Sequence, residues 1–308
     1  MHIQQLIKEI NTIYLGKPEV VELCFTALLA DGHILLEDVP GTGKTMLAKT
    51  IADSFHGDFS RIQFTADLLP SDIIGTDFFN LKTQEFENKQ GPIFSNIVLI
   101  DEINRAVPRT QSALLEAMEE RQVTIGGATY RLPQPFFVIA TQNPIESSGT
   151  FPLPDAQLDR FMMCLNMGYP EKQFEVQLLE EIMTNMRHEI GISISYDELL
   201  TQKEAISSVL LSRDLLHYIV NLADATRSHR HVETGVSPRA TIALAKAARS
   251  LAYLRNRDYV IPEDIKHLAP HVLSHRLTLS IEGEIKTTKR DILLEILNQV
   301  AVPVEVGM

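Results

Sequence analysis

A short glycine-rich segment constrains this chain more than any other feature: residues 37–45 read EDVPGTGKT. The segment follows an apolar run at residues 33–37 and precedes a helical pattern at residues 44–55, so we expect a loop between a buried strand and a helix. Such a loop exposes backbone N–H groups and ends at a helix N-terminus, and both bind phosphate oxygens. The segment therefore predicts a P-loop in an α/β fold.

The P-loop pattern assigns a role to each of its polar residues. Lys44 would reach the β- and γ-phosphates of a nucleotide, and the Thr45 hydroxyl would bind Mg²⁺. Asp38 stands where the pattern opens with glycine, and this carboxylate bears on nucleotide affinity rather than on the identity of the motif. The residues that we expect to contact the nucleotide are Pro40, Gly41, Thr42, Gly43, Lys44, Thr45 and Met46.

Apolar runs alternate with helical patterns through the first half of the chain. Candidate strands lie at residues 33–37, 59–64, 97–101, 136–141 and 161–165, and candidate helices lie at residues 3–13, 19–30, 44–55 and 110–120. This series predicts an open, five-stranded parallel sheet with right-handed crossovers and helices on both faces. We expect this αβα nucleotide-binding domain to span residues 1–168.

The second half of the chain is almost entirely helical in pattern. Helices are expected at residues 171–187, 212–226, 238–255, 262–275 and 284–300. The sequence Gly168-Tyr169-Pro170 is the natural boundary, and residues 169–308 would form an all-helical domain.

Two inserted hairpins interrupt the alternation of strands and helices. Residues 78–87 contain two short apolar runs around a polar turn, and residues 122–132 place Gly126-Gly127 between two β-branched runs. A glycine pair is typical of a tight hairpin, because its turn requires positive φ at both central residues.

Two carboxylates, Asp101 and Glu102, end the apolar run at residues 97–101. The carboxyl ends of parallel strands are where α/β proteins bind nucleotides. Asp101 is placed to hold Mg²⁺ through water, and Glu102 to polarise a water that attacks the γ-phosphate. Asn143 follows the run at residues 136–141, and its amide could position the same water.

These motifs together resemble those of AAA+ ATPases, and in detail those of the MoxR family. The resemblance covers residues 13–276 and rests on EDVPGTGKT, LIDEINRA, QSALLEAMEE, ATQNP, LPDAQLDRF and GVSPRA. It implies hydrolysis of ATP to ADP and phosphate, with Mg²⁺ as cofactor. It makes the helical domain a lid, residues 78–87 the insert in the second helix, and residues 122–132 the hairpin before the first sensor. Asp38 also occurs in members of this family.

The resemblance also implies roles for individual residues. Asn143 would be the first sensor, and Leu15 and Gly16 would contact the adenine through their backbone. Arg160 would be the arginine finger that reaches the γ-phosphate of the neighbouring subunit, with Arg105 as its rival. A guanidinium suits this role because its planar donors match phosphate oxygens. The second sensor would be Arg239.

A finger supplied by a neighbour requires self-assembly, and the resemblance implies a ring, a hexamer. MoxR-like proteins commonly work with a partner that bears a von Willebrand factor A domain. Together they mature or activate client protein complexes, sometimes with metal insertion. The leading hypothesis is therefore a chaperone-like remodelling ATPase.

The charge balance weighs against nucleic acid as a partner. Lys and Arg number 28 and Asp and Glu number 40, which gives a net charge of −12, so binding to a polyanion would need a local basic patch. A nucleic-acid motor stays an alternative, because similar hairpins occur in replicative helicases of the same branch. A magnesium-chelatase motor subunit is a second alternative. A nucleotide-sensing scaffold is a third, although Glu102 and Arg160 are residues that only hydrolysis requires.

Three further features bear on the role of the cysteines, the role of two histidines and the location of the protein. Cys24 and Cys164 lie far apart in apolar segments, which favours reduced, buried thiols. His271 and His275 have the spacing of a metal pair, but Val272 replaces the glutamate of the HExxH motif. With no signal-peptide pattern and no apolar run long enough to span a bilayer, we expect a cytoplasmic protein without membrane insertion.

Overall fold

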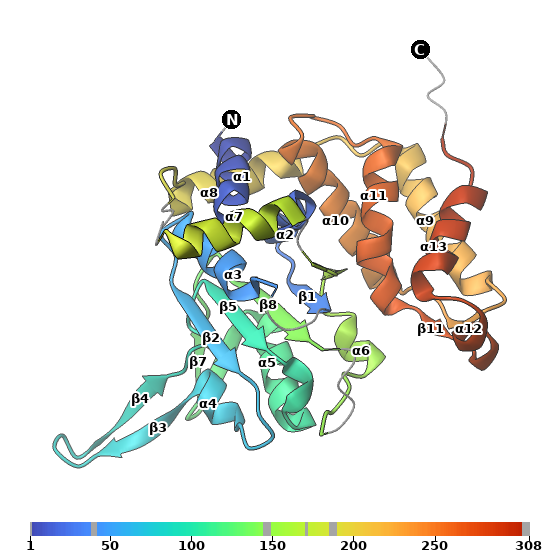
Figure 1. Cartoon of the computed structure of the whole chain (residues 1–308). Helices are drawn as coiled ribbons and strands as arrows, with labels where there is room; N and C mark the ends of the chain where they lie inside the picture. The colour runs from blue at the N-terminus through green and yellow to red at the C-terminus, as the bar shows by residue number, and fades with distance from the viewer. Residues whose placement is uncertain (1, 38–41, 144–148, 170–171, 185–189, 304–308) are drawn as a thin grey trace. The chain divides into compact units, whose positions relative to one another are not determined.

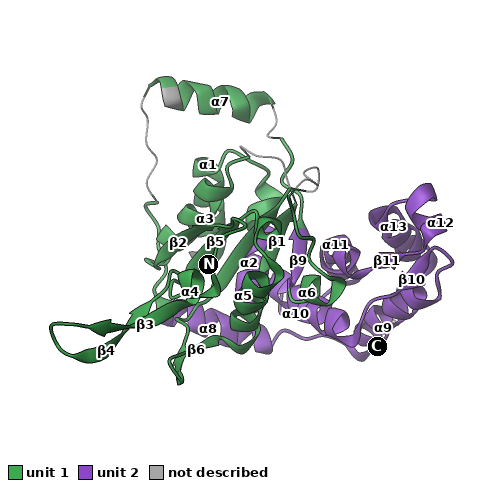
Figure 2. Ribbon diagram, turned by 90° about the horizontal axis from the view of Figure 1, so that it is seen from below, with its two compact units in different colours: residues 1–21, 33–160, 165–196 green, residues 22–32, 161–164, 197–308 purple. Residues whose placement is uncertain are grey.

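The structure, a computed structural model, describes residues 2–37, 42–143, 149–169, 172–184 and 190–303. By its internal contacts the chain divides into two compact units (Figure 2). The first comprises residues 1–21, 33–160 and 165–196, and the second comprises residues 22–32, 161–164 and 197–308. This division crosses the chain at several points, whereas the boundary expected at residue 168 is a single cut and stays a prediction.

A five-stranded sheet organises the nucleotide-binding half of the fold (Figure 1). Its order is β2-β5-β8-β1-β9, formed by β1 (Ile34–Glu37), β2 (Phe59–Gln63), β5 (Ile97–Asp101), β8 (Phe137–Gln142) and β9 (Met163–Leu165). The pairs β2–β5, β5–β8 and β8–β1 are parallel. All five residues of β5 are buried, as a continuous apolar run in a parallel sheet requires. The predicted α/β class is confirmed.

The helices of the first unit begin, except for α1, near a proline or at a strand-to-helix loop. They are α1 (His2–Ile13), α3 (Lys44–Asp53), α4 (Pro70–Ile74), η1 (Ile103–Arg105), α5 (Pro108–Glu120), α6 (Asp155–Leu158) and α7 (Lys172–Met183). Helix α2 (Pro18–Leu29) begins in the first unit and continues into the second. Helix α4 was not expected, because five residues are too few to show a helical period. Its first turn is held by Asp72 Oδ2, which accepts the N–H of Leu69 at 2.9 Å.

Both expected hairpins are present. Strands β3 (Gly75–Asn80) and β4 (Glu85–Gln90) form the first, which is longer than residues 78–87, and β6 (Gln122–Ile125) and β7 (Ala128–Arg131) form the second. Gly126 and Gly127 have φ of 57° and 86°, as the tight turn requires. A Cβ on Gly126 would lie 1.4 Å from Asp77 Oδ2. The two hairpins therefore touch at this glycine.

The second unit is helical, with one small two-stranded sheet. Its elements are α8 (Tyr196–Ser207), α9 (Arg213–Ser228), β10 (Val232–Thr234), α10 (Pro238–Leu254), α11 (Pro262–Leu273), η2 (Ser274–Arg276), β11 (Thr278–Leu279), α12 (Ile281–Lys286) and α13 (Lys289–Gln299). Pro238 and Pro262 open their helices as expected. Helix α8 was not expected, since its sequence shows only a weak amphipathic pattern.

The prediction of a single helix at residues 284–300 is wrong. The chain forms α12 and α13 instead, and Thr287 between them is extended with φ of −155°. The Thr288 hydroxyl accepts the N–H of Asp291 at 3.1 Å and thereby caps α13. Threonine at an N-cap satisfies a donor that the helix cannot, so a new helix begins here.

A buried hydrogen bond agrees with a structural interpretation of His275. No group of three or more potential metal ligands occurs among the described residues. His275 Nε2 lies 3.0 Å from the Phe161 carbonyl oxygen, to which it must donate. Cys24 is buried and Cys164 partly buried, and no disulfide joins them. None of the helices in the described parts of the chain is long and apolar enough to cross a bilayer.

Candidate active site

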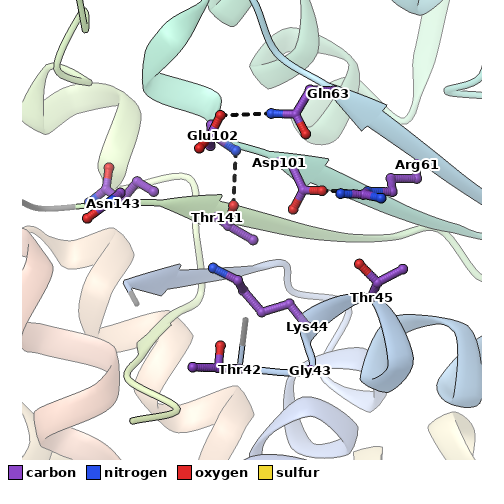
Figure 3. Close-up of a pocket in the computed structure, with 11 residues that line it drawn as sticks. Thr42, Gly43, Lys44, Thr45, Arg61, Gln63, Asp101, Glu102, Thr141 and Asn143 are labelled. Carbon is purple, nitrogen blue, oxygen red and sulfur yellow. Dashed lines mark hydrogen bonds and ion pairs between the residues drawn. The ribbon is translucent and has the colours of Figure 1, made fainter. Parts of the chain in front are cut away.

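A pocket of about 350 Å³ opens where α3 begins and where β2, β5 and β8 end (Figure 3). It is lined by Thr42, Gly43, Lys44, Thr45, Arg61, Gln63, Asp101, Glu102, Thr141, Gln142 and Asn143. The structure therefore brings together the predicted P-loop residues Lys44 and Thr45, the predicted carboxylates and the predicted sensor Asn143. All of these residues belong to the first unit.

The entry to α3 explains how the loop presents its polar side chains. Gly43 has φ of 82°, a left-handed conformation that glycine adopts without steric cost. The next residues, Lys44 and Thr45, form the first turn of α3, and Figure 3 shows Lys44 directed across the pocket toward Thr141. Asp38, Pro40 and Gly41 lie outside the described residues. Met46 is 46% exposed and does not line the pocket.

The two carboxylates differ in their backbone as well as in their exposure. Asp101 is the last residue of β5 and is buried. Glu102 follows it with φ of 57°, which is uncommon for a residue with a side chain. The Glu102 N–H donates to Thr141 Oγ1 at 3.0 Å. This bond from β8 holds the backbone of Glu102 in the turn that directs its side chain into the pocket.

Residues of the neighbouring strand hold both carboxylates, and no motif in the sequence marks them. Arg61 Nε lies 2.6 Å from Asp101 Oδ2, and Gln63 Nε2 donates to Glu102 Oε2 at 2.8 Å. Both residues are on β2, which pairs with β5 so that Gln63 lies opposite Asp101. The available signal is their spacing, because residues two apart on a strand share a face. It becomes informative only once β2 is known to lie beside β5.

The predicted adenine contacts lie next to the loop but not in the lining of the pocket. Leu15 and Gly16 follow α1, and Leu15 is buried. Cβ atoms built on Gly16 and Gly43 would approach the ring of Tyr14 to 2.3 Å and 3.3 Å. Tyr14 thus packs between the turn at residues 15–16 and the start of α3. Contact between that turn and an adenine stays a prediction.

The three candidate arginines occupy different surroundings. Arg105 Nε lies 2.9 Å from Oε2 of Glu102 in the same chain. Arg160 Nε lies 3.3 Å from Glu119 Oε2, so this side chain has an ion-pair partner within its own chain. Arg239 is exposed in the first turn of α10, in the second unit. Its approach to a nucleotide stays a prediction.

The donor set of the pocket fits a nucleotide with its magnesium ion. One ammonium group and the N-terminus of α3 suit phosphate oxygens, and a hydroxyl and a carboxylate are the hard oxygen ligands that Mg²⁺ prefers. A second carboxylate, Glu102, is 27% exposed at its side chain and can meet a water. The pocket can therefore hold a triphosphate and activate water beside it.

Comparisons with known proteins agree with this geometry. The model of the ATPase family associated with various cellular activities (AAA) matches residues 33–163, and the AAA lid domain model matches residues 224–296. Chaperone MoxR1 of Mycobacterium tuberculosis is 42% identical over 98% of this chain and 82% of its own. The uncharacterised protein YeaC of Bacillus subtilis is 49% identical over 97% of this chain and 94% of its own. A crystal structure of a candidate ATPase from Cytophaga hutchinsonii superposes with a TM-score of 0.91, at 42% identity, covering 98% of this chain and 95% of that one.

Fold and site together define an AAA+ ATPase, with a P-loop αβα core and a region that matches the AAA lid. Such an enzyme binds nucleotide and hydrolyses ATP. The relatives named MoxR are similar enough to this chain, over enough of its length, to assign it to one family within this class. The chain belongs to the MoxR family of AAA+ ATPases.

Proposed function

We propose that this chain uses ATP hydrolysis to remodel client protein complexes, as a chaperone-like motor. The observation that carries the proposal is the convergence of Lys44, Thr45, Asp101 and Glu102 on one pocket. Hydrolysis of ATP needs a cation that binds the phosphates, a site for the metal ion and a base that activates water. The pocket contains residues suited to all three.

The proposal assigns a role to five of the residues that line the pocket. Lys44 binds the β- and γ-phosphates, while Thr45 and Asp101 hold Mg²⁺, which when bound neutralises charge on the phosphate oxygens. Glu102 accepts a proton from the attacking water, and Asn143 orients that water. The held backbone of Glu102 supports this assignment, because a base works best when its orientation is fixed in advance.

Two arginines complete the site in an assembly. Arg160 acts as the finger on the γ-phosphate of a neighbouring subunit, and Arg239 acts as the second sensor. A head-to-tail contact of this kind generates a closed ring, and we propose a hexamer. The Arg105–Glu102 ion pair supports Arg160 over Arg105, because Arg105 is engaged with the proposed base of its own pocket, whereas the partner of Arg160, Glu119, does not line the pocket.

The client side of the proposal rests on the relatives. MoxR1, at 42% identity, is named a chaperone. We propose a cytoplasmic assembly in which a von Willebrand factor A-domain partner selects a client complex for maturation, activation or metal insertion.

The test combines two variants in the native host. Lys44→Ala should abolish ATP turnover, whereas Glu102→Gln should bind ATP without hydrolysing it. Proteins captured by tagged Glu102→Gln but not by Lys44→Ala are identified by mass spectrometry. Capture of a von Willebrand A-domain protein with one enzyme complex supports the proposal. Unchanged turnover in Lys44→Ala would falsify it, and nuclease-sensitive capture of nucleic-acid proteins would redirect it to a nucleic-acid motor.

A further inference from the structure

Arg61 on β2 and Asp101 on β5 form an ion pair, which the pairing of these two strands makes possible. Strand β2 is the edge strand of the sheet, and Arg61 lies opposite Leu99, two residues before Asp101. Its side chain reaches forward along the strand, so that Nε meets Asp101 Oδ2 at 2.6 Å (Figure 3). Arg61 thereby places a permanent positive charge in the lining of the pocket.

The two members of this ion pair differ sharply in exposure. The Arg61 side chain is 52% exposed and that of Asp101 only 10%. A half-exposed guanidinium can leave for solvent at small cost, because water replaces its partner. A buried carboxylate has no such option and requires a compensating cation. Asp101 therefore needs a cation beside it at all times. If another cation binds Asp101, the Arg61 side chain can move away into solvent.

We propose that Arg61 competes with magnesium for Asp101, so that binding of the metal with the nucleotide displaces the guanidinium. The inference rests on the proposed function, in which Asp101 holds Mg²⁺. Two cations that share one carboxylate repel each other, and the repulsion is only partly screened beside a buried group. Arg61 thus raises the magnesium concentration at which the site fills.

The neighbouring residue on the same face shows why we infer competition rather than simple positioning. Gln63 holds Glu102 with a neutral amide, which orients a carboxylate without opposing a cation. Arg61 holds Asp101 with a full charge. A residue that only oriented Asp101 for magnesium would strengthen metal binding, whereas a competing cation weakens it. The two roles predict effects of opposite sign.

The test measures metal binding directly, without turnover. Mn²⁺ is titrated into the full chain carrying one equivalent of a non-hydrolysable ATP analogue, with no excess that would itself chelate the metal, and free Mn²⁺ is read from its electron paramagnetic resonance signal. We expect Arg61→Gln to bind Mn²⁺ about three- to tenfold more tightly than the wild type, because a neutral side chain replaces the competing charge. Arg61→Lys, which keeps the charge, should stay within about twofold of the wild type.

Controls separate this inference from the proposed function. Arg131→Gln removes the same charge from an exposed position on β7 outside the pocket lining and should leave Mn²⁺ binding unchanged. Equal or weaker binding in Arg61→Gln overturns competition. Failure of the wild type to bind the analogue, measured first by calorimetry in the presence of Mg²⁺, contradicts the proposed function itself. Far-UV circular dichroism confirms that each variant is folded.

Discussion

At the scale of single residues, the backbone of Glu102 is the most constrained feature of the site. Its φ of 57° is held by the hydrogen bond from its N–H to the hydroxyl of Thr141, a residue only 2% exposed, while its carbonyl oxygen accepts the N–H of Arg105 at 2.8 Å. A side chain in the left-handed region costs about 1 kcal/mol or more. The proposed base therefore depends on an acceptor from the next strand.

This dependence predicts the effect of Thr141→Val, which keeps the shape of the side chain and removes its acceptor. We expect kcat for ATP hydrolysis to fall about tenfold, with nucleotide affinity within about twofold of the wild type. Thr141→Ser, which retains the hydroxyl, should keep most of the activity. Equal losses in both variants would show that packing, and not the hydrogen bond, holds Glu102.

A second residue-scale prediction concerns pH. Burial, and secondarily the charge of Arg276, hold the pKa of His275 well below its ordinary value near 6.5, although the Phe161 carbonyl opposes this shift. Below pH 6.5 the unfolded chain takes up a proton that the folded chain refuses. Stability is therefore lost as the pH falls through the unfolded-state pKa near 6.5, by roughly 1 kcal/mol from this group.

The measurement is urea unfolding followed by far-UV circular dichroism, since the chain has no tryptophan. The free energy of unfolding of His275→Gln should fall less steeply with pH than that of the wild type. His217, exposed on α9, provides the matched control, and His217→Gln should retain the wild-type slope. Parallel slopes for the wild type and His275→Gln would contradict the prediction.

The sequence predicted some residues of the pocket and not others, for a physical reason. Lys44, Thr45, Asp101 and Glu102 are adjacent to the strands and helix that position them, so local pattern is enough to find them. Gln63 and Thr141 contact Glu102 from β2 and β8. Their roles depend on the strand order, which depends on packing between distant segments.

At the scale of elements, the break between α12 and α13 shows the same limit. The apolar spacing at residues 284–300 allows one continuous helix, and the competing hydrogen bond of Thr288 decides against it. Helix α4 is short enough that its cap determines it, while continuous apolar runs located the five strands of the sheet. Patterns predict elements reliably where burial dominates, and less well where a single polar contact sets a boundary.

The cap on α13 can be tested with two adjacent threonines. Thr288→Ala removes both the bond from the Asp291 N–H and the bond to the Asp291 carboxylate at 2.6 Å. We expect the free energy of unfolding to fall by about 1 kcal/mol. Thr287→Ala changes the same side chain one residue earlier, outside the cap, and should cost less than about 0.5 kcal/mol. Similar losses in chemical denaturation would argue against capping as the cause of the break.

At the scale of the whole molecule, the proposed ring makes a prediction about mixed subunits. Arg160→Ala chains lack a finger but have an intact pocket, and Glu102→Gln chains have a finger but no base. Each should be inactive alone. Mixed at equal amounts, they should regain about a quarter of the wild-type ATPase activity, because about one contact in four joins an intact pocket to an intact finger.

Arg105 provides the contrast for this experiment. Because Arg105 pairs with Glu102 of its own chain, Arg105→Ala damages the pocket that carries it. Its mixture with Glu102→Gln should therefore stay inactive. Rescue by Arg105→Ala chains, with none by Arg160→Ala chains, would reverse the assignment of the finger.

The discontinuous path of the chain has a consequence for its synthesis. Residues 22–32 belong to the second unit, where Ser250 donates to the Thr26 carbonyl oxygen and Arg255 pairs with Glu22. These partners are translated more than two hundred residues later. The apolar face of α2, with Phe25 fully buried in the folded protein, cannot pack against these partners until they have been synthesised. We therefore expect a nascent chain of this protein to leave the apolar face of α2 without these partners for most of its translation, a state that favours binding by a holdase chaperone.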